Sequence, residues 1–211
     1  MPERRQNRRA AVSERKREII LDAARDVFAE EGLDGASLRA IAVRAGYTPA
    51  ALYFHFDSKE ALYAALLHDS LGALGRAVAA AVSQAKGPEQ ELKAAAMAFF
   101  DFYAQNPRDL DLGFYLFRGG MKPAGLGQER DVTLNAALEA ALRPIGDAAV
   151  TLGASRARAN LLMVDCFAHA AGLLLLLHTG RIRMFGASAG ERMKAYVEER
   201  IDLLQVEEKA C

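Results

Sequence analysis

Asp165, Cys166 and His169 are the residues whose types and spacing come nearest to catalytic or metal chemistry. Asp165 and His169 are four positions apart, so on a helix they share one face, where such a pair can ligate a metal or exchange a proton. The sequence contains no HExxH, CxxC, P-loop or GxGxxG pattern to support that chemistry. Three interpretations stay open: a metal or catalytic pair, a ligand or dimer contact, and a buried polar pair. For the whole protein we expect no enzyme activity, no metal and no cofactor.

The hydroxyl and cationic residues between positions 37 and 59 have the chemistry to bind a nucleic acid. Ser37 can cap a short helix whose apolar positions 38, 41, 42 and 45 fall on one face. Gly46 follows the last turn of that helix, where a left-handed residue commonly ends it. Thr48 can cap the next helix, with Pro49 at its first position. Helix, short turn and helix is the pattern of a helix-turn-helix.

This stretch resembles the DNA-binding signature of the TetR family of bacterial transcriptional regulators. The run LYFHF followed by SKEAL is more specific than a generic helix-turn-helix, and the similarity covers roughly the first 65 residues. The resemblance implies that Tyr53, His55 and Lys59 contact DNA phosphates. The positions expected to contact DNA on the whole head are Ser37, Arg39, Arg44, Thr48, Pro49, Ala50, Tyr53, His55 and Lys59.

The first turn of the expected reading helix, residues 48–51, has little hydrogen-bonding capacity. Base reading would therefore depend on contacts with thymine methyl groups, on Arg39 or Arg44, and on a basic N-terminal arm. The packing of a small domain is the competing interpretation for Tyr53 and His55.

Charge is distributed unevenly along the 211 residues, although the formal net charge is zero. Residues 1–17 carry seven Arg and Lys against two Glu, which favours a basic surface that meets a polyanion. Two cysteines give no disulfide framework and are typical of a reducing cytosol. The basic start lacks an apolar core of a signal peptide, and the longest apolar run, 170–177, is shorter than a membrane span needs. We expect a cytoplasmic protein without a membrane partner.

Helical periodicity and an Ala-, Leu-, Glu- and Arg-rich composition predict an all-α fold. We expect a basic disordered arm at 1–12, a helix-turn-helix domain at 13–57 and a helical ligand-binding and dimerisation domain at 58–211. Within these, helices are expected at 13–31, from 57 or 58 to 85, at 88–105, 108–118, 128–142 with a continuation past Pro144 towards 152, at 155–178, and from about 190 to 206.

The C-terminal half is rich in aromatic and Met side chains, most of which ordinary core packing would also explain. The resemblance implies a small-molecule pocket in this half, for which the candidates are Phe99, Phe102, Tyr103, Phe114, Tyr115, Phe117, Arg118, Met163, Phe167 and His169. The last two long helices are too apolar for one small domain to cover, so we expect them to pair with a second chain. The expected dimer contacts are Leu174, Met193, Val197, Ile201 and Leu204.

Together these features predict a homodimeric, sequence-specific DNA-binding regulator whose partners are a double-stranded DNA operator and a small-molecule effector. Its interpretation as a repressor released by a hydrophobic or amphipathic ligand follows from the resemblance. Two alternatives remain: a non-specific DNA-binding nucleoid protein, and a ligand-binding helical protein with a vestigial DNA head.

Overall fold

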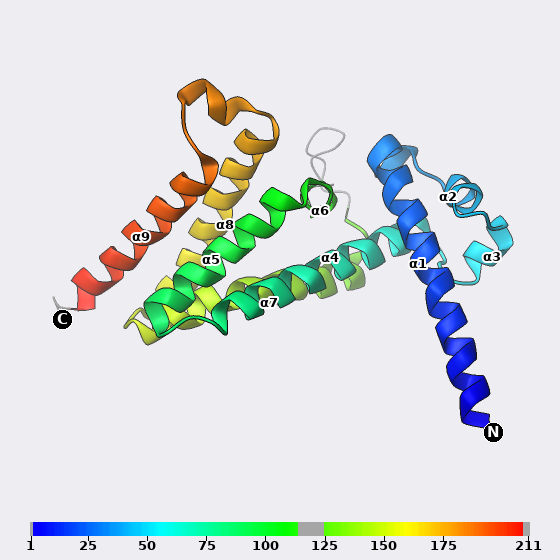
Figure 1. Cartoon of the computed structure of the whole chain (residues 1–211), viewed down its shortest axis with the longest axis horizontal. Helices are drawn as coiled ribbons and strands as arrows, with labels where there is room; N and C mark the ends of the chain where they lie inside the picture. Colours follow the sequence, from blue (N-terminus) through cyan, green and yellow to red (C-terminus); the bar gives the residue numbers. More distant parts are fainter. Residues whose placement is uncertain (1, 114–124, 209–211) are drawn as a thin grey trace. The chain divides into compact units, whose positions relative to one another are not determined.

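The computed structural model describes residues 2–113 and 125–208, and throughout these residues the secondary structure is helical, as predicted (Figure 1). The helices in the first half are α1 (Pro2–Gly35), α2 (Leu38–Arg44), α3 (Pro49–Tyr53), α4 (Lys59–Val82), α5 (Pro88–Gln105) and α6 (Pro107–Gly113). Those in the second half are α7 (Gln128–Thr151), α8 (Arg156–His178), the 3-10 helix η2 (Arg181–Phe185) and α9 (Ala189–Glu208).

Most helix boundaries follow the predicted caps. The hydroxyls of Ser37, Thr48 and Ser155 each accept a hydrogen bond from the backbone N–H three residues ahead, at 3.2, 3.2 and 3.3 Å. Ser58 does the same for the N–H of Ala61 at 3.1 Å, so Ser58 rather than Asp57 caps α4. Short polar side chains therefore set the start of these four helices, as the sequence pattern indicates.

Three boundaries differ from the prediction. The backbone is already helical from Pro2, so residues 2–12 extend α1 instead of forming a disordered arm. Their Arg-, Gln- and Ala-rich composition has high intrinsic helix propensity, and Pro2 occupies a first-turn position where proline is tolerated. The expected loop at 180–189 contains η2, whereas α7 runs through Pro144 without a break. Of the helix expected at 108–118, the structure describes the part in α6 up to Gly113, and the remainder lies outside the described residues.

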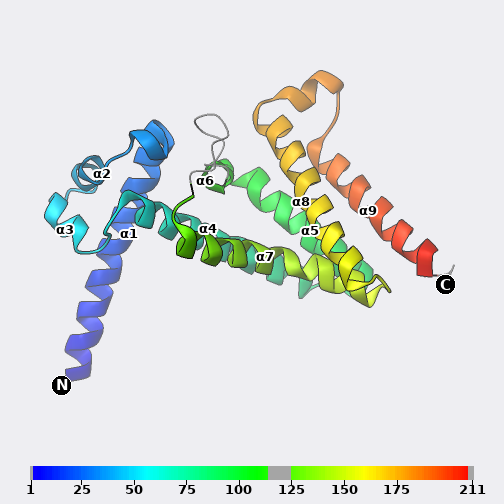
Figure 2. The same cartoon turned by 180° about the vertical axis from the view of Figure 1, so that it is seen from behind.

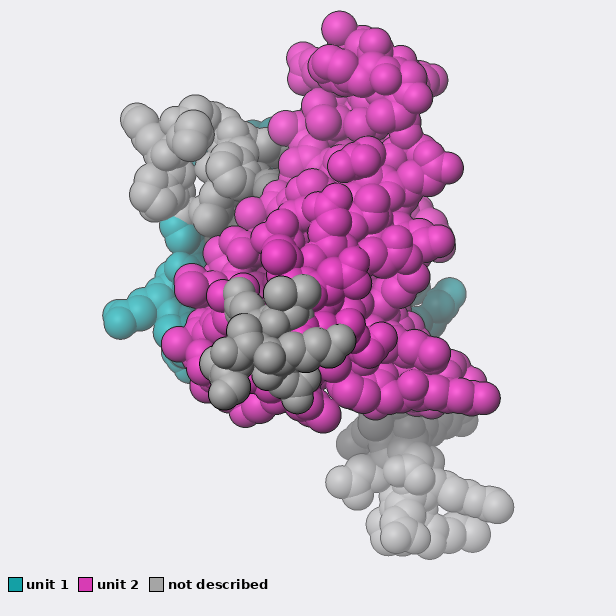
Figure 3. Space-filling view, turned by 90° about the vertical axis from the view of Figure 1, so that its left-hand side faces the viewer, with its two compact units in different colours: residues 1–69, 111–134 teal, residues 70–110, 135–211 magenta. Residues whose placement is uncertain are grey.

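The chain packs as two compact units, residues 1–69 with 111–134 and residues 70–110 with 135–211 (Figure 3). Helix α4 is continuous and belongs to the first unit up to Asp69 and to the second from Ser70. The domain boundary predicted at residue 57 divides the chain into two consecutive segments, whereas each compact unit combines segments that are distant in sequence. The functional division into a DNA-binding and a ligand-binding domain stays a prediction.

The core of the first unit joins α1, α2, α3 and α4 through fully buried aliphatic and aromatic side chains. Ile41 and Leu52 have no exposed surface, and Phe28 packs edge-on against Tyr63 with ring centroids 4.9 Å apart. The Tyr63 hydroxyl donates a 2.9 Å hydrogen bond to the buried carbonyl of Leu112. Gly32 breaks the helical run of α1 with a φ of 71°, which turns the chain towards α2.

In the second unit α5, α8 and α9 pack against one another (Figures 1 and 2). Leu92, Phe100, Leu174 and Met193 are each at most 2% exposed at this junction of helices. At its rim, Lys93 of α5 is paired with Glu198 of α9. Helix α7 also contacts α8, because Gly146 lies so close to Met163 that an added Cβ would come within 2.8 Å of its sulfur.

By length and composition two of the described helices, α4 and α8, could cross a membrane. Core helices of globular proteins meet the same criterion, so this observation is weak evidence for a span. Only 28% of the apolar window in α8 is buried within this chain, which leaves much of its apolar surface uncovered.

Tyr63→Phe should destabilise the first unit by about 1–3 kcal/mol, because the buried Leu112 carbonyl loses its partner. The measurement is the urea midpoint of unfolding. Tyr53→Phe is the matched control, since Tyr53 is 60% exposed and its variant should unfold at the wild-type midpoint. Equal midpoints for all three proteins would contradict a stabilising role for the Tyr63 hydroxyl.

Candidate nucleic-acid interface

The turn between α2 and α3 brings two capped helices together within four residues. Gly46 adopts a left-handed conformation with a φ of 73°, and its N–H donates to the Val43 carbonyl at 3.1 Å. The N–H of Tyr47 then donates to Ala42 at 2.8 Å, which completes a glycine-terminated helix end. A side chain at position 46 would be strained, so glycine fixes this turn.

Leu52 decides which face of α3 points outward. It has no exposed surface and is the buried residue of this five-residue helix. Thr48, Ala50 and Tyr53 are exposed, with Ala50 on the side opposite Leu52, and Arg39 is exposed on α2. Ser37 is also exposed, whereas Pro49, His55 and Lys59 are half-buried. The structure therefore brings the predicted DNA contacts together on one small domain, with their contact roles still a prediction.

Arg44 is held by a carboxylate of α1. Its two terminal nitrogens donate to the two oxygens of Glu30 at 3.0 and 2.7 Å, a bidentate pair. The hydrogen bond from Arg44 lowers the pKa of Glu30, and the same bond raises the pKa of Arg44. This pair fastens α2 to α1. An arginine whose donors are directed at Glu30 is poorly placed to read a base, so the structure favours a structural role for Arg44.

Lys59 sits at the first position of α4, and its ammonium donates to the backbone carbonyl of Asp34 at 3.1 Å. This contact joins the start of α4 to the end of α1. Next to it, Arg130 of α7 approaches Asp57 at 3.4 Å. A lysine ammonium has three donors, so Lys59 can keep the carbonyl of Asp34 and still face a phosphate.

Phe54 and Val43 are exposed apolar residues of the head that the sequence analysis did not single out. Phe54 is 86% exposed and Val43 is 71% exposed, which is unusual for side chains of this size. The ring of Phe54 stands edge-on to His55, with centroids 5.5 Å apart and planes at 89°. One signal in the sequence could have indicated this exposure. Phe54 follows Ala50 by four residues, so the two share a helix face opposite Leu52.

Most of the predicted ligand residues that the structure describes lie together in the second unit. Phe99, Phe102, Tyr103 and Phe167 form an edge-to-face cluster between α5 and α8, with centroids 5.2–5.7 Å apart. Burial raises the pKa of the Tyr103 phenol, and the neighbouring backbone carbonyl of Tyr103 lies 3.0 Å from the Nε2 atom of His178. Met163 is half-buried beside Gly146. The predictions at Phe114, Tyr115, Phe117 and Arg118 lie outside the described residues.

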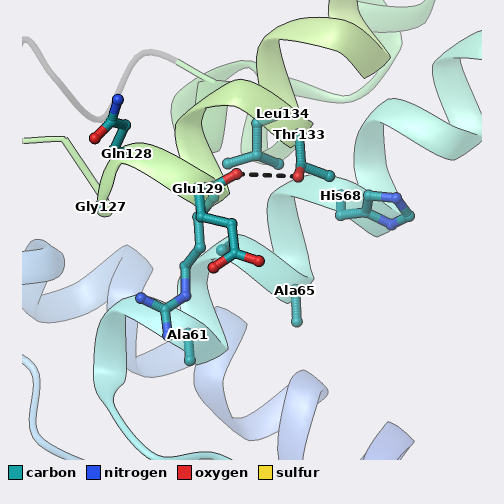
Figure 4. Close-up of a pocket in the computed structure, with 10 residues that line it drawn as sticks. Ala61, Ala65, His68, Gly127, Gln128, Glu129, Thr133 and Leu134 are labelled. Atoms are coloured by element: carbon teal, nitrogen blue, oxygen red, sulfur yellow. Dashed lines mark hydrogen bonds between the residues drawn. The ribbon is translucent and has the colours of Figure 1, made fainter.

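A groove of about 550 Å³ lies between α4 and the first turns of α7 (Figure 4). Among the predicted ligand residues that the structure describes, none lines it. Its apolar lining residues are Ala61, Ala64, Ala65 and Leu134, and its polar ones are His68, Gln128, Glu129, Arg130 and Thr133. The Thr133 hydroxyl donates to the backbone carbonyl of Glu129 at 3.0 Å (Figure 4). This volume falls in the range of small-molecule sites.

The residues predicted to form the dimer contact are buried inside the single chain. Leu174, Met193, Val197, Ile201 and Leu204 are at most 7% exposed, because this stripe packs within the second unit. The exposed apolar side chains on the same two helices are others: Leu161, Val164, Leu175 and Leu203, between 43% and 65% exposed. A partner chain would meet this second set first.

Asp165, Cys166 and His169 do not form a common site. Asp165 is exposed, whereas Cys166 is buried and its thiol pKa is raised to about 12 by that burial. His169 stacks on Tyr196 of α9 with ring centroids 3.9 Å apart, and burial lowers its pKa. Within the part of the chain that the structure describes, no three potential metal ligands are grouped.

Residues 186–190 read Gly-Ala-Ser-Ala-Gly, a match to the G-x-S-x-G pattern that presents a nucleophilic serine in some hydrolases. That chemistry requires a turn from a strand into a helix. Ser188 instead follows a 3-10 helix, and its hydroxyl accepts a 3.4 Å hydrogen bond from the N–H of Glu191. It therefore acts as the cap of α9.

The class of protein follows from this geometry. A three-helix head with a capped helix-turn-helix, followed by a larger helical domain, is the architecture of a DNA-binding protein. Residues 20–66 match the model of the family described as bacterial regulatory proteins, tetR family. Residues 20–66 therefore have the sequence of the DNA-binding region of the TetR family of bacterial transcriptional regulators.

Comparisons with individual proteins agree with this match, and a solved structure extends the similarity of fold over most of the chain. The chain is similar to the HTH-type transcriptional activator FasR of Mycolicibacterium smegmatis, 36% identical over 52% of this chain and 50% of that protein. It is 31% identical to the transcriptional repressor NicS of Pseudomonas putida over 47% of each chain. It thus spans about half the length of the curated relatives it matches. The Bacillus subtilis regulator FadR, solved with stearoyl-CoA, superposes with a TM-score of 0.64 at 17% identity over 89% of this chain and 96% of that one.

Replacing Arg44 by Ala, Glu30 by Gln, or both should give small losses of thermal stability that are not additive near neutral pH. The lowered pKa of Glu30 means that its carboxylate stabilises the fold above the ordinary value of 4.5, and that this stabilisation disappears as the pH falls through the lowered value. The difference between the loss in the double variant and the sum of the two single losses, measured from melting temperatures, should therefore vanish in acid. Neither variant should change which DNA sequence is preferred, and relaxed preference in Arg44→Ala would instead make Arg44 a base reader.

Proposed function

We propose that this protein is a sequence-specific DNA-binding regulator, a repressor that a hydrophobic or amphipathic small molecule releases from its operator. The observation that carries the proposal is the head itself, in which Leu52 is buried and the opposite face of α3 is exposed. A short helix presented in this way is the part of a helix-turn-helix that enters the major groove. The family match over residues 20–66 supports the same assignment.

Binding is proposed to occur as a homodimer on a palindromic operator, because one short reading helix contacts only a few bases. The uncovered apolar side chains of α8, Leu161, Val164 and Leu175, support a partner chain there, since exposed apolar patches of this kind mark association surfaces. The protein is proposed to act in the cytoplasm, without enzyme activity or a cofactor, as transcription regulators of this kind do.

The effector is proposed to act through α4, which starts at the head and carries one wall of the groove. Ala61, Ala64 and Ala65 of that wall lie within two turns of the cap at Ser58, and the groove residue Arg130 approaches Asp57 at the foot of the head. A lining that combines apolar and polar side chains suits an amphipathic molecule. FadR of Bacillus subtilis was solved with stearoyl-CoA, which makes long-chain acyl thioesters the first compounds to test.

Two alternatives predict different results. A nucleoid protein that binds by charge alone would show no preference over random DNA. A ligand-binding protein with a vestigial head would bind the effector and show only background affinity for DNA. The capped, glycine-terminated turn and the outward face of α3 favour the proposed regulator over a ligand-binding protein with a vestigial head.

Lys59→Ala should weaken binding to specific and random DNA by the same factor. Each phosphate contact releases a counterion, so the slope of log affinity against log salt should fall by about one. Binding is measured by fluorescence anisotropy at several salt concentrations. Lys93→Ala is the matched control, because Lys93 is paired with Glu198 in the second unit and its loss should leave the slope unchanged. An unchanged slope for Lys59→Ala would remove its phosphate role.

Ala65→Phe should abolish release of DNA by an effector that occupies the groove, because the added ring fills the space between α4 and α7. Affinity for DNA without effector should stay near the wild-type value. Ala136→Phe, on an exposed position of α7 that does not line the groove, is the control and should respond normally. A normal response from Ala65→Phe would place the effector elsewhere, with the aromatic cluster around Phe99 as the next site to test.

A further inference from the structure

The outer face of the reading helix is apolar. Ala50, Tyr53 and Phe54 follow one another at i, i+3 and i+4 and are all exposed, opposite the fully buried Leu52. An ordinary surface helix buries its apolar stripe, whereas this short helix exposes a second one. Phe54 is the extreme case, with 86% of its surface in solvent.

The ring of Phe54 is also held in place. Its backbone N–H donates to the carbonyl of Ala50 at 3.3 Å, so Phe54 continues the helical turn. Its ring stands edge-on to the half-buried His55, with centroids 5.5 Å apart. A bulky side chain that is both exposed and oriented loses little further freedom when it meets a partner.

Several polar groups of the head that could read bases are engaged within the protein. The Thr48 oxygen accepts from the N–H of Ala51, the Arg44 guanidinium is bidentate with Glu30, and Lys59 donates to a backbone carbonyl. Hydrogen-bond reading along α3 is therefore limited. The apolar group that a major groove offers is the C5 methyl of thymine.

We propose that Phe54 is a specificity-determining residue that reads thymine by packing against its C5 methyl, with the small side chain of Ala50 allowing close approach. This inference rests on the proposed function, because it requires the head to enter a major groove. It assigns to the protein an operator whose half-sites carry thymines at the positions facing α3, and the contact with Phe54 recognises the methyl group that cytosine and uracil both lack.

The test compares thymine with deoxyuridine, which lacks only that methyl. A duplex obtained by in vitro selection with the full-length protein is remade with one thymine at a time replaced by deoxyuridine. Wild-type affinity should fall about fourfold at each contacted thymine, the change expected for losing contact with one methyl group. Phe54→Ala should bind the thymine and deoxyuridine duplexes equally. Because Phe54 is exposed, this variant should keep the wild-type melting temperature.

Phe185→Ala is the matched control. Phe185 is a 74% exposed phenylalanine of η2 in the second unit, and its variant should retain full discrimination between thymine and deoxyuridine. Selective DNA binding by the wild type without any effect of deoxyuridine would overturn the inference while leaving the proposed function intact. A uniform loss for Phe54→Ala on every duplex would also overturn it, since Phe54 would then pack on the sugar–phosphate backbone. Failure to select any preferred sequence would overturn both.

Discussion

A five-residue helix cannot hold its shape alone, because it completes too few backbone hydrogen bonds to offset the cost of nucleation. Everything that α3 does therefore depends on the burial of Leu52 and on the caps at either end. Thr48 satisfies a free N–H at the start, and the left-handed Gly46 before it sets the angle at which the chain enters. The buried side chain fixes rotation about the helix axis, and this decides that Ala50, Tyr53 and Phe54 face outward.

The head is fastened to its supports by polar contacts that link distant segments. Arg44 joins α2 to α1 through Glu30, Lys59 joins α4 to the end of α1, and Arg130 of α7 reaches Asp57 in the turn before α4. Each pair is exposed, so none contributes much stability by itself. Their common effect is positional: under the proposed function, a change in α4 or in the first turn of α7 reaches the head through these contacts. The groove between these two helices is where a small molecule would gain such leverage.

Local signals made much of this architecture predictable. The caps at Ser37, Thr48 and Ser155 and the left-handed Gly46 depend on residues within a few positions, which a sequence displays directly. Pairings between distant segments were not predictable. The partner of Arg44 lies 14 residues away, and the stripe from Leu174 to Leu204 packs inside the chain although its periodicity equally suits a partner helix. Phe54 was missed because apolar residues are expected inside, and its spacing from Ala50 was too weak a signal to outweigh that expectation.

The most direct test of the account is the ratio of affinities for specific and random DNA. The purified protein is titrated at physiological salt against the duplex immediately upstream of its own gene, or one found by selection, and against a random duplex of equal length. The account predicts a ratio of about a thousand or more, since a head that reads bases gains several kcal/mol over phosphate contact alone. Equal affinity for both duplexes, with a steep salt dependence for each, would show that the head binds by charge only and would contradict the proposed regulator.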